Sequence, residues 1–182
     1  MIIAQKKRKE NIAEYVLYMW QIEDIIRANR FDADAIRRQV VDRYNQPEEV
    51  KDKINRWYEE IVEMMRSEGV MQKGHIQLNT NVVTELTDLH LRLLASHKEM
   101  LYNAAYYKAL PYIVQLRAKS GGKEIPELET CFTAIYGYLT LKMQQKEINP
   151  ETEEAIRELA ALLAILAEKY REEVYGESNT GE

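Results

Sequence analysis

The sequence predicts an all-α protein, an antiparallel bundle of six or seven helices, and three observations lead to that prediction. Apolar residues recur every three or four positions through most of the chain, which is the spacing of one helix face. Proline, glycine and asparagine gather between these periodic segments, where they end or begin helices. No segment alternates apolar and polar residues for long enough to predict a strand, and the short connections favour antiparallel neighbours.

The first helix is expected from about Gln5 to Ala28. Its core face consists of Tyr15, Val16, Met19, Ile22 and Ile26. Other large apolar residues cover much of the remaining circumference, so this helix should be surrounded by other helices. Asp32 is expected to cap a short second helix that ends at Tyr44.

The third helix is expected to begin at Pro47, which is placed like a first-turn proline, and to stop at Gly69. Residues 69–79 form a loop, and a long fourth helix starts near Asn79 to Asn81. Pro111 should kink or break that helix, because its ring removes one backbone hydrogen bond and clashes with the preceding turn.

The fourth helix is therefore expected to reach about Tyr107, with a second segment from about Leu110 to Lys119. Pro126 opens the fifth helix, and the sixth, capped by Asn149, runs to about Tyr175. We expect one helical domain over residues 1–175 and a disordered tail over residues 176–182.

The composition excludes several classes of protein. The chain has 182 residues, 46% of them hydrophobic, which is enough for a sizeable core. Its net charge of −5 argues against a dedicated nucleic-acid binder. The single cysteine, Cys131, excludes an intramolecular disulfide and a CxxC metal knuckle. It lies on the inward face of its expected helix and is interpreted as a small core residue.

Two features of the sequence bear on the location of the protein. The basic run Lys6 to Lys9 follows the short apolar patch at Met1 to Ala4, an order that does not fit a signal peptide. The longest uninterrupted apolar run, Leu159 to Ala167, is much shorter than the roughly 20 residues of a membrane span. We therefore expect a cytoplasmic protein without a membrane contact.

His90 and His97 are the strongest hint of chemistry in the sequence. On a continuous helix both would lie in the middle of an apolar stripe, where a titratable group needs a polar partner. Glu23 on the first helix could orient either histidine, with Arg27 neutralising the carboxylate. Such a group would be the skeleton of an acid–base or metal site. The alternative is a buried structural network that fixes helix register.

Two further patterns bear on catalysis. Arg92 and His97 match the loose Arg-x(4–6)-His pattern of HEPN-type helical ribonucleases, although they lie about 140° apart on an ideal helix. A ferritin-like di-iron centre would need Glu-x-x-His motifs, which the sequence lacks. A three-histidine metal site would have to recruit His75 from the loop before the helix, and no spacing supports it. We expect neither metal nor cofactor.

Aromatic residues cluster on the first helix and around Pro111. The chain has 12 tyrosines against 2 phenylalanines, a ratio that suits half-wet surfaces and interfaces. Tyr106, Tyr107 and Trp20 are the candidate ligand-binding residues. The cluster could line a ligand groove or a dimer contact, and packing between helices explains it equally well.

The last helix carries large aliphatic residues on both sides. Leu162 and Ile165 lie opposite Ile156 and Leu163. Either this helix is sandwiched within the monomer or its outer face contacts a second subunit. We favour a homodimer through Leu162 and Ile165.

Several stretches carry a resemblance to a known family. They are residues 8–15 (RKENIAEY) continuing through 20–24 (WQIED), residues 86–94 (LTDLHLRLL) and residues 106–111 (YYKALP). Together they resemble an uncharacterised helical family of Bacteroidetes bacteria, catalogued as domain of unknown function 4924. The resemblance covers about residues 1–170 and implies a stand-alone cytoplasmic bacterial protein. It implies no activity, ligand or catalytic residue.

Two functions follow from these patterns. The first is a non-enzymatic helical protein, homodimeric, that acts through protein or small-ligand contacts. The alternative is an enzyme, either a metal-assisted hydrolase or a HEPN-like ribonuclease, that uses His97 with Glu23, Arg27 or Arg92.

Overall fold

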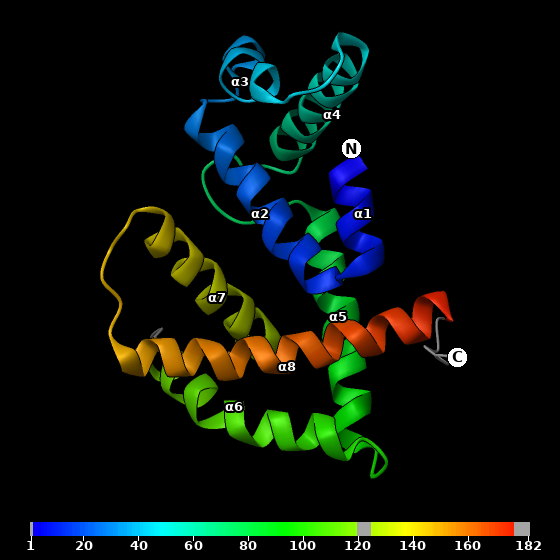
Figure 1. The fold of residues 1–182 in the computed structure, drawn as a ribbon, viewed down its shortest axis with the longest axis vertical. Helices are drawn as coiled ribbons and strands as arrows, with labels where there is room; N and C mark the ends of the chain where they lie inside the picture. The colour runs from blue at the N-terminus through cyan, green and yellow to red at the C-terminus, as the bar shows by residue number, and fades with distance from the viewer. Residues whose placement is uncertain (1, 120–124, 177–182) are drawn as a thin grey trace. The chain divides into compact units, whose positions relative to one another are not determined.

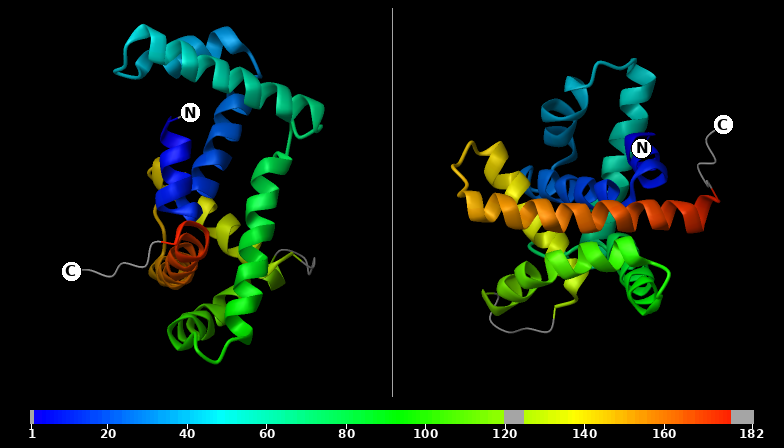
Figure 2. Two further views of the ribbon diagram at one scale, coloured as in Figure 1. Left: turned by 90° about the vertical axis from the view of Figure 1, so that its right-hand side faces the viewer. Right: turned by 60° about the horizontal axis from the view of Figure 1, so that its bottom comes forward.

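The computed structural model describes residues 2–119 and 125–176, and these residues form eight α-helices and one 3₁₀ turn without a strand (Figures 1 and 2). The helices are α1 (Ile2–Glu10), α2 (Ile12–Ala28), α3 (Ala33–Gln39), α4 (Glu48–Ser67), α5 (Gln77–Ala95), α6 (Met100–Lys119), α7 (Glu127–Met143) and α8 (Pro150–Tyr175). The 3₁₀ turn η1 (Val41–Arg43) follows α3. The predicted all-α fold is confirmed.

The chain separates into two compact units. Unit 1 comprises Met1–Arg8 and Glu14–Asn81, and unit 2 comprises Lys9–Ala13 and Val82–Glu182. The expectation of one domain over residues 1–175 stays a prediction. Residues 177–182 of the expected disordered tail lie outside the described residues.

In unit 1 the helix ends follow the signals in the sequence. The Asp32 carboxylate accepts the N–H groups of Asp34 and Ala35 at 2.9 and 3.1 Å and so caps α3, as predicted. Helix α4 ends beside Gly69, whose φ of 71° is a conformation that glycine adopts without strain. Helices α3 and α4 pack against each other.

The expected first helix is two helices in the structure. Helix α1 ends at Glu10 and α2 begins at Ile12. The Asn11 side chain accepts the N–H of Ala13 at 3.1 Å, the short-range contact with which asparagine competes against a continuous helix. The expectation of an unbroken helix from Gln5 to Ala28 is therefore wrong at Asn11.

The long fourth helix breaks earlier than predicted. Helix α5 ends at Ala95, and a turn is formed where the Ser96 carbonyl accepts the N–H of Glu99 at 3.3 Å. Helix α6 then continues through Pro111, which contradicts the expected break there. Pro111 and Tyr107 are both exposed, so water can hydrate the Tyr107 carbonyl that the proline leaves without its helical donor.

Unit 2 is built around α8. Helix α6 packs along α8 and runs in the opposite direction, and α7 packs against both (Figures 1 and 2). The buried residues of α8 are Leu159, Leu162, Leu163, Leu166, Ala167 and Tyr170. Leu162 is fully buried within the chain and Ile165 is half-buried.

Packing within the chain already covers the Leu162 side chain, and the expected homodimer through Leu162 and Ile165 stays a prediction. The alternative considered for α8, a helix sandwiched within the monomer, is the arrangement that the structure has. None of the helices described has the length and apolar character needed to cross a membrane.

Candidate functional site

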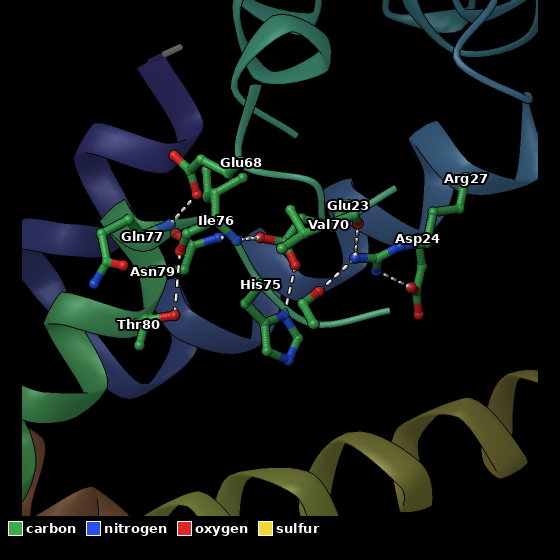
Figure 3. Close-up of polar contacts among 11 residues, drawn as sticks. Glu23, Asp24, Arg27, Glu68, Val70, His75, Ile76, Gln77, Asn79 and Thr80 are labelled. Carbon is green, nitrogen blue, oxygen red and sulfur yellow. Dashed lines mark hydrogen bonds and ion pairs between the residues drawn. The ribbon is translucent and has the colours of Figure 1, made fainter. Parts of the chain in front are cut away.

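The Glu23 carboxylate is the centre of a polar cluster in unit 1, and Figure 3 shows it pointing from α2 toward the start of α5. Its side chain is fully buried. Oε1 accepts the backbone N–H of Ile76 at 3.0 Å and the Asn79 side-chain amide at 2.7 Å, and Oε2 lies 2.5 Å from His75 Nδ1. A negative charge is stabilised at this place because the N-terminus of α5 offers free N–H groups and a positive dipole end.

His75 is the accessible member of this cluster. Its ring stacks on Trp20, with the ring centroids 4.0 Å apart and the planes 8° from parallel. Its side chain is 31% exposed, and its Nε2 points away from Glu23 in Figure 3. A carboxylate that holds one imidazole nitrogen leaves the other nitrogen oriented to accept a proton or bind a metal.

Among the described residues no group of three or more His, Cys, Asp or Glu side chains could hold a metal ion. The Glu23 carboxylate beside Nδ1 gives His75 the arrangement of an oriented base.

Arg27 holds the loop before α5 in place. Its guanidinium donates to the carbonyl of Val70 at 3.1 Å and to the carbonyl of Gly74, and it pairs with Asp24 at 2.8 Å (Figure 3). The terminal nitrogens of Arg27 are thus bonded to Asp24, Val70 and Gly74, and the expectation that Arg27 neutralises Glu23 stays a prediction. Glu68 adds a further anchor by accepting the N–H of Gln77 at 2.5 Å.

His90 belongs to a different cluster, in unit 2. It is buried on α5, and its Nδ1 lies 2.6 Å from the hydroxyl of Tyr102 on α6. Its Nε2 lies 3.6 Å from Glu127, the first residue of α7. Burial lowers the pKa of His90 below its usual 6.5 more than the Glu127 carboxylate raises it. His90 is thus a neutral core residue that joins three helices.

Tyr106 completes this second cluster. Its ring meets His90 edge-on, with the centroids 5.4 Å apart. Burial and a hydrogen bond to Glu127 raise its pKa to about 12. Arg117 lies 3.9 Å from Glu127. The predicted burial of His90 is confirmed, but Glu23 is bonded to His75, Ile76 and Asn79 instead of orienting His90.

The Arg92–His97 pair does not form a site. His97 is exposed in the turn after α5, so its expected place on an apolar helix face is wrong. Arg92 lies on the exposed side of α5 and pairs with Glu173 at 2.6 Å. The helix ends at Ala95, and the spacing that predicted one face therefore no longer applies at His97.

The three aromatic candidates for ligand binding have different surroundings. Trp20 packs on His75 in unit 1, whereas Tyr106 packs on His90 in unit 2. Tyr107 points to solvent on the outer face of α6. The sequence analysis does not predict the roles of His75, Asn79 and Glu127. For Glu127 the sequence does offer one signal, its position in the first turn of a helix after Pro126.

The outer face of α6 carries an exposed apolar stripe. It consists of Met100, Ala104, Tyr107, Pro111, Val114 and Ala118. On an ideal helix these six residues lie within about 40° of one line. We call this set the α6 stripe. Leu101 lies beside it and is also exposed. An exposed face of this kind is typical of a contact surface.

The comparisons with known proteins identify a family and no activity. No curated protein and no solved structure matches the chain. The model of one family, described as a domain of unknown function (DUF4924), matches residues 1–177. Because that match covers nearly the whole chain, the protein belongs to the DUF4924 family.

Proposed function

We propose that this protein is a non-enzymatic helical protein of the cytoplasm that acts through protein contacts and forms a homodimer through the α6 stripe. One observation carries the proposal. The large apolar side chains on this face are exposed by 76% at Met100, 68% at Tyr107 and 59% at Val114, and Leu101 beside them is exposed by 82%. Side chains of this size on one helix face are stabilised when a second surface removes them from water.

The size of the surface supports a weak, reversible dimer. The stripe runs from Met100 to Ala118, about 27 Å along the helix at 1.5 Å per residue. The accessible area on one helix face of that length is smaller than the roughly 800 Å² that each partner buries in a standard interface. We therefore expect dissociation in the micromolar range. The single free cysteine, buried at Cys131, supports a reducing compartment.

The test is the oligomeric state of the full chain. Sedimentation velocity from about 1 to about 200 µM covers the concentrations at which such a dimer forms. The wild type should shift from monomer to dimer, and Tyr107→Glu should remain monomeric with an unchanged circular dichroism spectrum. Met143→Glu is the matched control, because Met143 is 71% exposed on α7 outside the stripe. A wild type that is monomeric at every concentration overturns the proposal.

The Glu23–His75 pair favours a second candidate function, that of a hydrolase with His75 as general base. A buried carboxylate fixes the imidazole, and the His75 side chain is 31% exposed. The test is a panel of RNA and phosphoester substrates. Activity that His75→Ala abolishes without unfolding the chain would establish this candidate. If the wild type is inactive on the whole panel and His75→Ala changes only the stability, the Glu23–His75 pair has a structural role and this candidate function is overturned.

A further inference from the structure

The α6 stripe has a spacing that reads the same from either end. Its six residues are separated by four, three, four, three and four positions. Alternation of three and four is the heptad spacing of a coiled-coil seam, in which apolar residues of two helices interlock. Because the order of the spacings is symmetric, the stripe superimposes on itself when the helix direction is reversed.

We propose that two copies of α6 pair antiparallel about a two-fold axis at the height of Ala109, an inference that rests on the proposed homodimer. The pairing places Met100 opposite Ala118, Val114 opposite Ala104, and Tyr107 opposite Pro111. Each pair occurs twice, as an isologous interface requires. The first and last residues of the stripe then meet at the two ends of the same contact.

The sizes of the paired residues select this orientation. Each antiparallel layer joins a larger side chain to a smaller one, so the space between the helices is filled evenly. Parallel pairing would place Tyr107 on Tyr107 and Met100 on Met100. It would also place Ala104 on Ala104 and Ala118 on Ala118, where no side chain would fill the gap. A parallel seam would therefore lose dispersion contacts in the layers that contain only alanine side chains.

One charge opposes this dimer. Leu101, Lys108 and Gln115 are seven residues apart on one flank of the stripe, and all three are exposed. In an antiparallel pair this flank meets the same flank of the second copy. The two Lys108 positions differ by about 3 Å in height across the axis, so their ammonium groups repel. The net charge of −5 on each copy adds repulsion between the chains.

Self-association should therefore increase with ionic strength. Screening weakens the repulsion between the two Lys108 side chains and between the whole chains. Lys108→Ala should tighten the dimer by about three-fold at low salt and reduce its dependence on salt. The same substitution in a dimer that does not bring the two Lys108 side chains together would leave the dissociation constant unchanged.

Cysteine cross-linking tests the orientation in the full-length protein. Ala104→Cys and Val114→Cys are made as single variants, mixed, and oxidised at a concentration at which the wild type is dimeric. The mixture should form a 104–114 disulfide, because these positions face each other across the axis. Ala104→Cys alone should not cross-link, because its two copies lie about 15 Å apart along the helices. Oxidation of the wild type, whose cysteine Cys131 is buried, measures the background level of cross-linking.

The outcomes separate this inference from the proposed function. A heterologous 104–114 disulfide without a 104–104 disulfide supports the antiparallel pair. Cross-linking of Ala104→Cys with itself shows a parallel pair, which overturns the orientation and leaves the homodimer standing. A wild type that is dimeric by sedimentation but forms neither disulfide overturns the seam. A wild type that is monomeric in all conditions overturns both proposals.

Discussion

Glu23 and Ile76, which are 53 positions apart in the sequence, are joined by a buried hydrogen bond of 3.0 Å from the Ile76 N–H to the Glu23 carboxylate. Ile76 immediately precedes α5. A helix start is normally capped by a side chain from its own segment, whereas here the acceptor comes from α2. The start of α5 therefore depends on a distant helix, and α2 depends on α5 to compensate a buried carboxylate.

Replacing Glu23 with alanine should destabilise the protein strongly. The change removes the shared acceptor of Ile76, Asn79 and His75, all held at one buried point. Loss of one partner from a buried charged network costs about 3–5 kcal/mol. Urea unfolding should show this decrease in the free energy of unfolding, with a smaller one for Glu23→Gln. Exposed Glu60→Ala is the control; an equal loss there would contradict a special role for Glu23.

The stability of the protein should fall below about pH 6.5 partly through His90. Burial lowers the folded-state pKa of His90 below 6.5, so between the two pKa values the unfolded chain binds more protons. The free energy of unfolding then decreases as the pH falls, by at most about 1.4 kcal/mol per pH unit from this group.

His90→Gln isolates this contribution, because glutamine keeps a polar partner for Tyr102 but does not titrate. Urea unfolding of both proteins at two pH values, above and below 6.5, gives the two slopes. The variant should lose less stability than the wild type between them. Identical losses would show that His90 does not contribute.

The helix boundaries show what local sequence signals determine. Asp32, Gly69 and Asn149 act where they were predicted to act, since a cap or a stop depends on a few neighbouring residues. The break falls at the Ser96 turn after α5 and not at Pro111, where the sequence predicts it. Helix α6 tolerates Pro111 because that face of the helix is exposed to solvent. Local sequence signals do not determine this exposure, because it depends on tertiary packing.

Cys131 should be unreactive in the folded protein. It is fully buried, and burial raises the pKa of its thiol to about 12, so almost no thiolate forms at neutral pH. Labelling with a thiol reagent at pH 8 should be slow in native buffer and fast in urea. Rapid labelling of the native protein would show that the α7 region opens readily.

The two helix caps should contribute about equally. Asn149 Oδ1 accepts the N–H of Thr152 at 2.7 Å, and Asp32 caps α3. Asn149→Ala and Asp32→Ala should each lower the free energy of unfolding by about 1 kcal/mol. The double variant should show their sum, because additivity is expected for separate sites. Thermal or urea unfolding checks both values.

The candidate site was only partly accessible to sequence reasoning. The pattern around Glu23 correctly indicated a polar residue on a buried face, because periodicity reports burial within one helix. It could not select His75 over His90 as the partner, because the partner is set by how the loop before α5 folds back on α2. The sequence does not predict the bonds from Arg27 to this loop for the same reason, since their acceptors are backbone carbonyls, which no residue pattern reveals.

The proline of the α6 stripe also acts on the unfolded chain. Residues 112–116 read YIVQL, a short uncharged segment with high β-propensity of the kind that forms intermolecular sheets. Pro111 lies directly before this segment and Arg117 directly after it. Proline cannot donate to a strand ladder and arginine repels its own copies, so together they act as gatekeepers against aggregation. The residue that weakens α6 as a helix thus protects the newly made chain before it folds.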